Sequence, residues 1–297
     1  MNGKDTDKAG RQRPLAWIIT GASQGFGRAL TVEALSRGDA VLATVRDEAS
    51  IRDLRDRYPD RLGVVTADLR DATAVERIVE TAAARFGTPD VLVNNAGRAI
   101  VGAAEELELA ELREQLEVNF FAAAALTRAI LPGMRQRGSG TIVQFSSQGG
   151  RLSFPGVGAY SASKFALEGW SEALAAEVAP FGVRIMVVEP SRFRTGFNTP
   201  HSLGMASALD AYADVVGPAR ADLTGADGIQ EGDPAKAARI IADLVRGEQV
   251  PLRLPLGAEA IRRLTDAYER DLAGVREWAE VARGADYPGV APSVRAV

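Results

Sequence analysis

The sequence contains no cysteine and only one histidine, His201. The absence of cysteine excludes disulfides, thiolate nucleophiles and cysteine-ligated metals. A single histidine excludes a histidine-rich metal site, and we expect no metal centre. A Ser-His-Asp triad would depend on His201 as its base. Because His201 lies in the polar stretch "NTPHSLGMAS", we interpret it as an exposed loop residue.

Long apolar runs and a strong charge of one sign are also absent. No stretch approaches 18 apolar residues, so we expect no membrane-spanning helix. Residues 1–14 are polar and lack the apolar core of a signal peptide, which predicts a disordered lead-in. The net charge of -4 gives no reason to expect nucleic acid or an anionic membrane as a partner. We therefore expect a cytoplasmic protein that acts on a small molecule.

Short apolar runs alternate with helical patterns from residue 15 onward. The expected strands are residues 15–20, 40–45, 62–69, 90–97, 140–147, 183–190 and 251–257. The expected helices are residues 26–37, 51–58, 71–86 with Asp71 as N-cap, about 108–136, 159–182, 234–246 and a C-terminal helix marked by Ile261, Leu264, Tyr268, Leu272 and Val275. This order predicts one α/β domain over residues 15–284. Its core would be a Rossmann-type, doubly wound parallel sheet of about seven strands with helices on both faces. Residues 285–297 are expected to form a loose tail.

Residues 191–231 interrupt this alternation with a polar, irregular segment. The segment is too long for a plain connection, so it is either a substrate lid or disordered. A lid would be roomy and partly hydrophobic, judging by Phe197, Leu203, Met205, Leu209, Tyr212, Val215 and Val216. The next helix has clear boundaries, with Asp233 as its cap, Pro234 at its first position and Gly247 at its end.

The stretch "TGASQGFG" between the first strand and the first helix supports two interpretations. Residues 21–25 match G-x-S-x-G, the nucleophile elbow that would make Ser23 catalytic. The glycines at 21, 25 and 27 also form a turn that lets the backbone approach a pyrophosphate and points the helix N-terminus at it. We favour the second, because an elbow would follow a later strand and a triad would need His201. The residues predicted to contact the cofactor in this turn are Gly21, Ser23, Gln24, Gly25, Phe26 and Gly27.

The second strand ends in Thr44-Val45-Arg46, without the carboxylate that binds the ribose 2′-hydroxyl of NAD. The planar guanidinium of Arg46 suits a 2′-phosphate, although Asp47 directly after it weakens that pairing. Gln24 is not basic and adds nothing to this preference. We therefore expect NADPH to be preferred, with NADH as an alternative, unless Arg46 is an ordinary surface arginine.

Tyr160 and Lys164 are four residues apart in "YSASK", on one face of an expected helix. The reference pKa of tyrosine is about 10, and a neighbouring ammonium lowers it. The pair is therefore suited to donate a proton to a carbonyl oxygen while hydride reaches the carbon. A surface Tyr-Lys pair is the alternative.

Several motifs together resemble the classical short-chain dehydrogenase/reductases over about residues 15–256. They are "TGASQGFG", "ADL" at 67–69, "NNAG" at 94–97, Asn119, "SS" at 146–147, "YSASK" at 160–164 and "VEPSRFRT" at 188–195. The stretch "FPGVGAYSASKFALEGWSEALAAE" is similar to the branch with NADP-dependent hydroxysteroid and retinol dehydrogenases and bacterial ketoreductases. The resemblance implies an NADPH-dependent carbonyl reductase or alcohol dehydrogenase. A non-catalytic NAD(P)-binding regulator on the same fold is the alternative.

The resemblance implies a role for each matching residue. Tyr160 matches the general acid/base, Lys164 the residue that lowers its pKa, and Ser147 the serine that orients the carbonyl. Asn119 matches the asparagine that holds a water of the proton relay. The implied cofactor contacts beyond the glycine turn are Arg46, Asp68, Leu69, Asn95, Ala96, Gly97, Tyr160, Lys164, Pro190 and Thr195. The family commonly forms homodimers or homotetramers through its two long helices, here about 108–136 and 159–180.

The sequence departs from this family at the glycine that usually follows the proline of "VEP", where it has Ser191 and then Arg192. A serine has less backbone freedom than glycine, so this loop is expected to sit differently against the nicotinamide. Arg98, directly after "NNAG", either faces the substrate and binds an anionic group or points to solvent.

Overall fold

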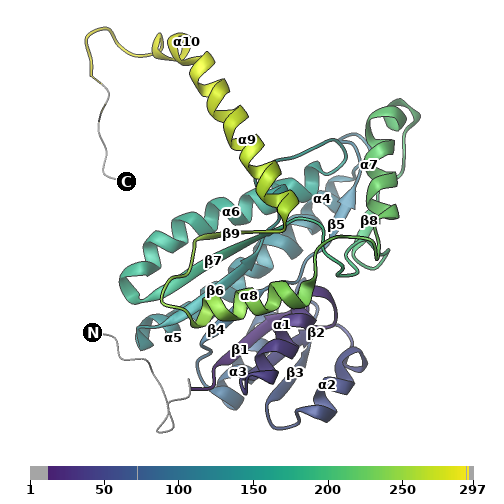
Figure 1. Ribbon diagram of the computed structural model, residues 1–297, viewed down its shortest axis with the longest axis vertical. Helices are drawn as coiled ribbons and strands as arrows, with labels where there is room; N and C mark the ends of the chain where they lie inside the picture. Colours follow the sequence, from purple (N-terminus) through teal and green to yellow (C-terminus); the bar gives the residue numbers. More distant parts are fainter. Residues whose placement is uncertain (1–12, 72, 292, 294–297) are drawn as a thin grey trace.

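A parallel sheet at the centre of the computed structural model organises the chain, which is described for residues 13–71, 73–291 and 293. Its seven strands run in the order β3-β2-β1-β4-β6-β7-β9 (Figure 1). They are β1 (Ala16–Thr20), β2 (Ala40–Val45), β3 (Leu62–Thr66), β4 (Val91–Asn94), β6 (Gly140–Phe145), β7 (Val183–Pro190) and β9 (Arg253–Leu256). The order reverses between β1 and β4, and such a switch point opens a crevice at the carboxyl ends of the strands. The predicted doubly wound sheet is confirmed.

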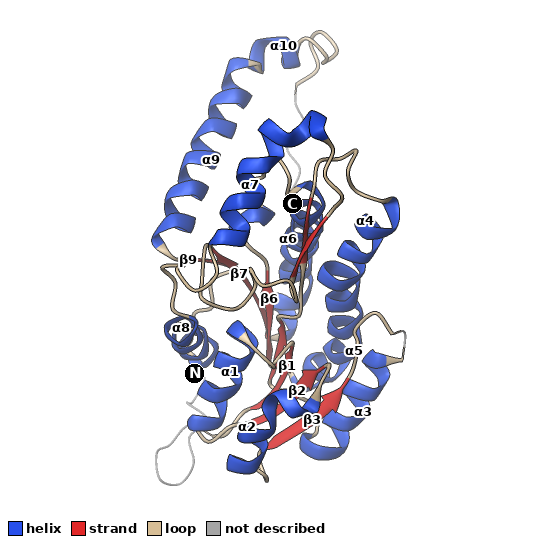
Figure 2. Ribbon diagram, turned by 90° about the vertical axis from the view of Figure 1, so that its right-hand side faces the viewer, coloured by secondary structure: helices blue, strands red, loops and turns tan. Residues whose placement is uncertain are grey.

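Helices cover both faces of this sheet (Figure 2). On one face lie α1 (Gly25–Ser36), α2 (Arg52–Arg57) and α8 (Pro234–Arg246). On the other lie α3 (Ala74–Phe86), α5 (Ala122–Arg137) and α6 (Gly158–Val178). Each face has its own apolar core, because parallel strands buried on both sides carry apolar residues in both directions. Packing on both faces of the sheet therefore fixes the positions of the carboxyl ends of its strands.

Three strands end earlier than expected, at Thr66, Asn94 and Phe145. Beyond these points the chain turns away into polar loops at the carboxyl edge of the sheet. The prediction of Asp71 as N-cap is wrong, because α3 begins at Ala74 with Thr73 as its cap. The Asp71 carboxylate instead accepts the Thr73 backbone N–H at 2.9 Å, a local turn that competes with capping.

The expected helix at about 108–136 is a continuous helical region with a change of winding. It consists of α4 (Leu109–Leu116), a π-helical segment over Glu117–Phe121, and α5. The other long helix, α6, ends at Val178 and is followed by a 3-10 turn over Ala179–Phe181. Segments of π-helix are rare and frequently occur at functional sites.

The segment 191–231 contains elements that the sequence did not predict. β8 (Leu203–Met205) pairs in parallel with β5 (Ala99–Val101), and α7 (Ala213–Gly225) follows a 3-10 turn over Asp210–Tyr212. Of its apolar residues, Leu203 and Val216 pack against Ala99 and Val101. These buried contacts give the segment, which we continue to call the lid, an ordered structure.

The C-terminal helix is confirmed as α9 (Ala258–Glu277), followed by α10 (Ala279–Arg283). Its predicted apolar stripe is wrong in most positions. Leu264 is buried, but Ile261, Tyr268, Leu272 and Val275 are exposed. The reason is visible in Figure 1, where α9 extends away from the sheet, so that only its first half packs against the body.

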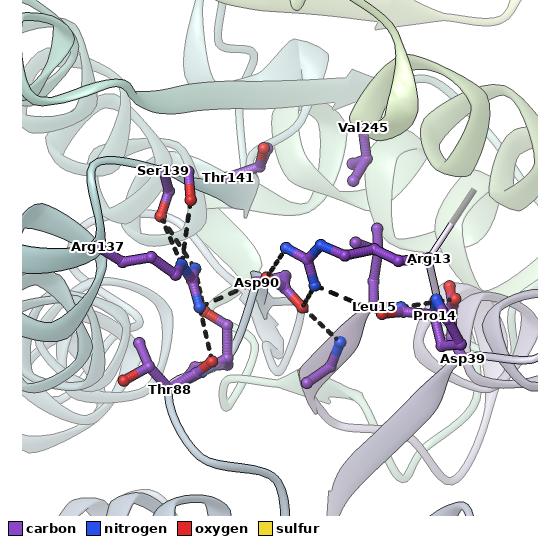
Figure 3. A network of polar contacts seen from close by, with 12 residues as sticks. Arg13, Pro14, Leu15, Asp39, Thr88, Asp90, Arg137, Ser139, Thr141 and Val245 are labelled. Carbon is purple, nitrogen blue, oxygen red and sulfur yellow. Dashed lines mark hydrogen bonds and ion pairs between the residues drawn. The ribbon is translucent and has the colours of Figure 1, made fainter. Parts of the chain in front are cut away.

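A charged network closes the amino-terminal edge of the sheet, opposite the crevice (Figure 3). The Asp90 carboxylate pairs with Arg13 at 2.7 Å and Arg137 at 3.4 Å, and it accepts the Ala16 backbone N–H at 2.8 Å. Arg13 of the expected lead-in is therefore attached to the domain. Residues 1–12 of that lead-in, and residues 292 and 294–297 of the expected tail, lie outside the described residues. No helix among the described residues is long and apolar enough to cross a membrane.

Candidate active site

A cavity of about 420 Å³ opens at the carboxyl ends of the strands, where the strand order predicts it. This volume lies within the usual range of small-molecule sites. The structure brings nearly all the predicted site residues to its wall. The exceptions are Gly27, which lies behind the turn, and Asn119, which lies behind Arg98.

The glycine turn connects β1 to α1 and has the backbone of a phosphate cradle. Gly21 and Gly25 have positive φ values of 65° and 55°, which side chains rarely adopt. A Cβ on Gly27 would lie 2.3 Å from the Gly21 carbonyl oxygen. No side chain caps α1, and its first turn carries no acidic residue. The N–H groups of that turn therefore remain available to an anion, which fits the pyrophosphate of a dinucleotide.

Ser147, Tyr160 and Lys164 meet in the same cavity. Ser147 follows β6, and its Oγ accepts the Gly149 backbone N–H at 3.0 Å. Tyr160 and Lys164 lie one turn apart on α6, with the Lys164 Nζ 5.8 Å from the centre of the Tyr160 ring. The Lys164 ammonium also donates to the Phe145 carbonyl oxygen at 2.8 Å.

Burial changes the proton affinity of both α6 residues. Contrary to the lowered value expected from the charge of Lys164, removal from water raises the pKa of Tyr160 to about 12, and only its hydrogen bond with Ser147 acts in the opposite direction. Burial lowers the pKa of Lys164 to about 8, against the charge of Glu168. At neutral pH the phenol is therefore protonated, and the amine is still mostly charged.

Asn119 lies in the π-helical segment, and its side chain is 2% exposed. Its Oδ1 accepts the Arg98 backbone N–H at 3.0 Å, and its Nδ2 donates to the Arg98 carbonyl at 3.0 Å and to Ser163 Oγ at 2.9 Å. The side chain thus connects the loop after β4 to α6. Its partner on α6, Ser163, directly precedes Lys164 in the sequence.

The residues expected around the adenosine line one end of the cavity. The Asp68 carboxylate accepts from the Arg70 guanidinium at 3.0 Å, which lowers its pKa to about 2. The Asn95 amide donates to the Thr20 and Gly21 carbonyls at 2.9 and 3.1 Å, and so supports the glycine turn. Leu69, Ala96 and Gly97 complete this part of the wall.

Arg46 is exposed at the tip of β2, and its guanidinium contacts Nε2 of His201. No hydrogen bond joins His201 to Ser23 or to a carboxylate in the part of the chain that the structure describes. The arrangement therefore offers no support for the hydrolase interpretation of the glycine turn.

The chain at the end of β7 also lines the cavity, through Pro190, Ser191, Arg192, Phe193 and Thr195. Ser191 accommodates the position expected for glycine without a positive φ, and its backbone N–H and Oγ donate to the Leu256 carbonyl at 3.0 and 3.2 Å. Arg192 pairs with Asp222 of α7 at 3.0 Å. Arg98 lines the cavity but pairs with Glu114 at 2.6 Å. Both arginines therefore have acidic partners within the protein.

The lid covers the candidate catalytic tyrosine. Phe197 lies 5.8 Å from Tyr160 between ring centres, and the two belong to one apolar cluster with Leu203, Val216 and Leu223. Sequence reasoning missed Phe154, Val157 and Leu223 in the cavity wall. It also missed Glu168 and Glu189, which are buried beneath the site. The only available signal for Glu168 is its position four residues after Lys164 on the same helix.

The fold and the cavity define the class of Rossmann-type dinucleotide-binding proteins, and comparisons with known proteins identify the family. The family model for short chain dehydrogenases matches residues 16–205. A short-chain dehydrogenase from Streptomyces avermitilis is 46% identical, with a TM-score of 0.88 over 93% of this chain and 100% of that chain. Oxidoreductase BOA17 from Botryotinia fuckeliana is 35% identical over 90% of this chain and 97% of its own length. A 3-ketodihydrosphingosine reductase from Bacteroides thetaiotaomicron is 38% identical over 68% of this chain and 73% of its own length.

The chain belongs to the short-chain dehydrogenase family and is an NAD(P)-dependent oxidoreductase. The resemblance inferred from the sequence motifs is confirmed.

Proposed function

We propose that the protein is an NADPH-dependent reductase that interconverts a carbonyl and a secondary alcohol. The observation that carries this proposal is the convergence of Ser147, Tyr160 and Lys164 in one cavity beside the glycine turn. The glycine turn and Pro190–Thr195 would hold a reduced nicotinamide cofactor, which would supply hydride to the carbonyl carbon. The remaining requirement is a proton for the carbonyl oxygen, together with stabilisation of its developing negative charge.

Tyr160 meets the first requirement as general acid. Its phenol is protonated at neutral pH, because burial raises its pKa to about 12. The carbonyl oxygen takes this proton as it becomes an alcohol, and the nearby Lys164 ammonium stabilises the phenolate that remains. In the oxidative direction the phenolate takes the proton back. Ser147 meets the second requirement by donating its hydroxyl to the carbonyl oxygen.

Asn119 acts indirectly in this scheme. Its side chain holds the Arg98 backbone and Ser163, which lies next to Lys164. We assign it the position of a relay residue, where it would support a water that returns a proton to Lys164 and Tyr160.

NADPH is the preferred cofactor in this proposal. The pyrophosphate would lie on the turn at Gly21–Gly27, and the adenosine would lie along Asp68, Leu69 and Asn95–Gly97. Pro190–Thr195 would hold the carboxamide. The preference rests on Arg46, which has no carboxylate within ion-pair distance among the described residues.

The substrate is proposed to be medium-sized and partly hydrophobic. The wall beyond Tyr160 is apolar, with Val101, Phe154, Val157, Phe197, Leu203 and Leu223. The name of the Bacteroides relative, a 3-ketodihydrosphingosine reductase, agrees with such a pocket.

Replacing Tyr160 with Phe tests the chemistry. The ring keeps its packing, but the proton donor is lost. We expect kcat to fall by about a thousandfold, while the Kd for NADPH changes by less than about twofold. Tyr58→Phe, which lies outside the cavity, is the control. Near-wild-type turnover of Tyr160→Phe across a carbonyl panel would overturn the mechanism.

Failure of the wild-type protein to oxidise NADPH with any member of that panel, despite tight cofactor binding, would favour the regulator alternative.

Replacing Arg46 with Ala tests the cofactor preference. Loss of a charged hydrogen bond should weaken NADPH by about tenfold or more while NADH binding stays nearly unchanged. Equal weakening of both cofactors, measured by calorimetric titration, would remove the role assigned to Arg46.

A homodimer or homotetramer is also proposed, formed through the helical region of α4 and α5 and through α6, as is common in the family. Phe121 and Phe165 support this proposal, because they expose about half of their surface, 52% and 47%, at the end of the π-helical segment and on α6. Light scattering of wild type and Phe165→Glu tests it. A monomeric wild type at micromolar concentration would contradict it.

A further inference from the structure

Two side-chain contacts join residues 201 and 202 of the lid to the cofactor-binding wall, one at the tip of β2 and one at the glycine turn. The Arg46 guanidinium contacts Nε2 of His201, and the Gln24 amide donates to Ser202 Oγ at 3.1 Å. His201 and Ser202 are neighbours on the lid, whereas Arg46 and Gln24 follow two different strands. A short part of the lid therefore spans the mouth of the cavity above the glycine turn.

This part of the lid is held by its own hydrogen bonds. The Ser202 and Leu203 backbone N–H groups donate to the Thr199 carbonyl at 3.0 and 2.9 Å, and Thr199 Oγ1 donates to the Gly196 carbonyl at 2.7 Å. Leu203 then enters β8 and is buried against the strand β5. His201 is thus presented on a folded turn and is the residue of that turn that reaches Arg46.

The contact between Arg46 and His201 joins groups that both serve as donors to anions. A guanidinium only donates, so the Nε2 atom that faces it is the acceptor of this contact. When an anion lies between the two, the guanidinium and an imidazole N–H can both donate to it. The acidic groups nearby are already engaged, since Asp47 accepts the Ala49 backbone N–H and Asp68 holds Arg70.

We propose that His201 is a second ligand of the cofactor 2′-phosphate. Arg46 would bind this group from the cavity wall, and His201 would bind it from the lid. This inference rests on the proposed preference for NADPH. The 2′-phosphate would replace the direct contact between the two side chains by a hydrogen bond to each. The lid would then be held more firmly by NADPH than by NADH, which has only a hydroxyl at this position.

The test is equilibrium binding to the full chain by calorimetry, with no turnover required. The probes are adenosine 2′,5′-bisphosphate and adenosine 5′-monophosphate, which differ only in the 2′-phosphate, together with NADPH and NADH. We expect His201→Ala to weaken adenosine 2′,5′-bisphosphate and NADPH by about tenfold, and the other two by less than about twofold. His201→Lys supplies N–H donors at the same position and should retain most of the discrimination. Leu209→Ala, an exposed lid position outside the cavity wall, is the control.

Three results would overturn the proposal. If His201→Ala weakens all four probes equally, His201 serves only the conformation of the lid. If it weakens none, the residue is not a ligand. If the wild type does not prefer adenosine 2′,5′-bisphosphate over adenosine 5′-monophosphate, the proposed preference for NADPH fails as well. If the wild type has this preference and His201→Ala retains it, only the inference on His201 is overturned.

Hydrogen exchange measures the predicted link to the lid separately. NADPH should slow amide exchange over residues 199–205 more than NADH does, and His201→Ala should abolish that difference. Equal protection by the two cofactors in the wild type would contradict binding of the 2′-phosphate by the lid.

Discussion

Gly27 illustrates how a single residue can determine whether the glycine turn between β1 and α1 can form. An added Cβ would lie 2.3 Å from the Gly21 carbonyl oxygen and 2.6 Å from the Asn95 amide nitrogen. The first of these is backbone, which cannot move aside without opening the turn. Although Gly27 does not line the cavity, it sets how closely α1 packs on the end of β1.

We therefore expect Gly27→Ala to weaken binding of both NADPH and NADH by about tenfold or more, because the pyrophosphate cradle must distort. Gly274→Ala is the matched control, since no atom lies within 4 Å of its added Cβ on α9. Calorimetric titration of both variants measures the effect. Unchanged affinity in Gly27→Ala would show that the turn tolerates the displacement.

At the scale of elements, α8 shows how a local signal can determine a boundary. The Asp233 carboxylate accepts the Ala235 and Lys236 backbone N–H groups at 2.8 and 3.3 Å, and Pro234 occupies the first helical position. These interactions involve only neighbouring residues, so the sequence predicted the start of the helix correctly. The buried face of α8 packs against α1 and thereby supports the glycine turn at the start of α1.

Asp233→Ala should lower the free energy of unfolding by about 1 kcal/mol, because two helix N–H groups lose their acceptor. Asp266→Ala on α9 removes an exposed ion pair with Arg262 and should cost less than about 0.5 kcal/mol. Urea denaturation of both variants measures the two values. A cost for Asp233→Ala no greater than for Asp266→Ala would contradict the capping role.

The lid is the element for which the sequence was least informative. Its strand β8 has only three residues and pairs with β5, about a hundred positions earlier in the chain. Neither strand has a local pattern that would predict it, because each is stabilised by the other. The contacts of Arg98 with Glu114 and of Arg192 with Asp222 likewise depend on elements that meet only in the folded chain.

At the scale of the whole molecule, two buried carboxylates and one arginine connect α6, β7 and β9. Glu168 comes from α6 and Glu189 from β7, and they are 2% and 1% exposed. Arg253 of β9 lies 3.2 Å from the first carboxylate and 3.8 Å from the second. One guanidinium faces two buried carboxylates, so burial and the charge of Glu168 raise the pKa of Glu189 to about 7.

This arrangement predicts a loss of stability between about pH 5 and about pH 7.5. The carboxyl of Glu189 binds its proton more tightly when folded than when unfolded. Its favourable contribution is therefore complete below the unfolded pKa of 4.5, is mostly still present at about pH 5, and is lost as the pH rises through the folded pKa of about 7. The wild-type free energy of unfolding should fall across this window by on the order of 1 kcal/mol. The pKa of Lys164 is lowered to about 8, so its titration raises the free energy of unfolding with increasing pH, and it does so only above about pH 8.

Glu189→Gln replaces the carboxyl by a neutral group of similar shape and should flatten this dependence. Urea denaturation at the two ends of the window compares the variant with the wild type. Parallel slopes for the two proteins would show that another group titrates in this range.

The sequence by itself determined the features that depend on neighbouring residues. The order of strands and helices, the glycine turn, the cap of α8 and the spacing of Tyr160 and Lys164 are all local, because each follows from backbone geometry within a few positions. Together these features were enough to predict the doubly wound sheet and the family.

The tertiary structure decided what depends on segments distant in the chain. It placed His201 against Arg46, paired Arg98 and Arg192 with acids, buried Glu168 beside Glu189 and left most of the α9 stripe exposed. The physical reason is that burial and charge pairing depend on which surfaces come together, and spacing along one helix or strand does not specify them.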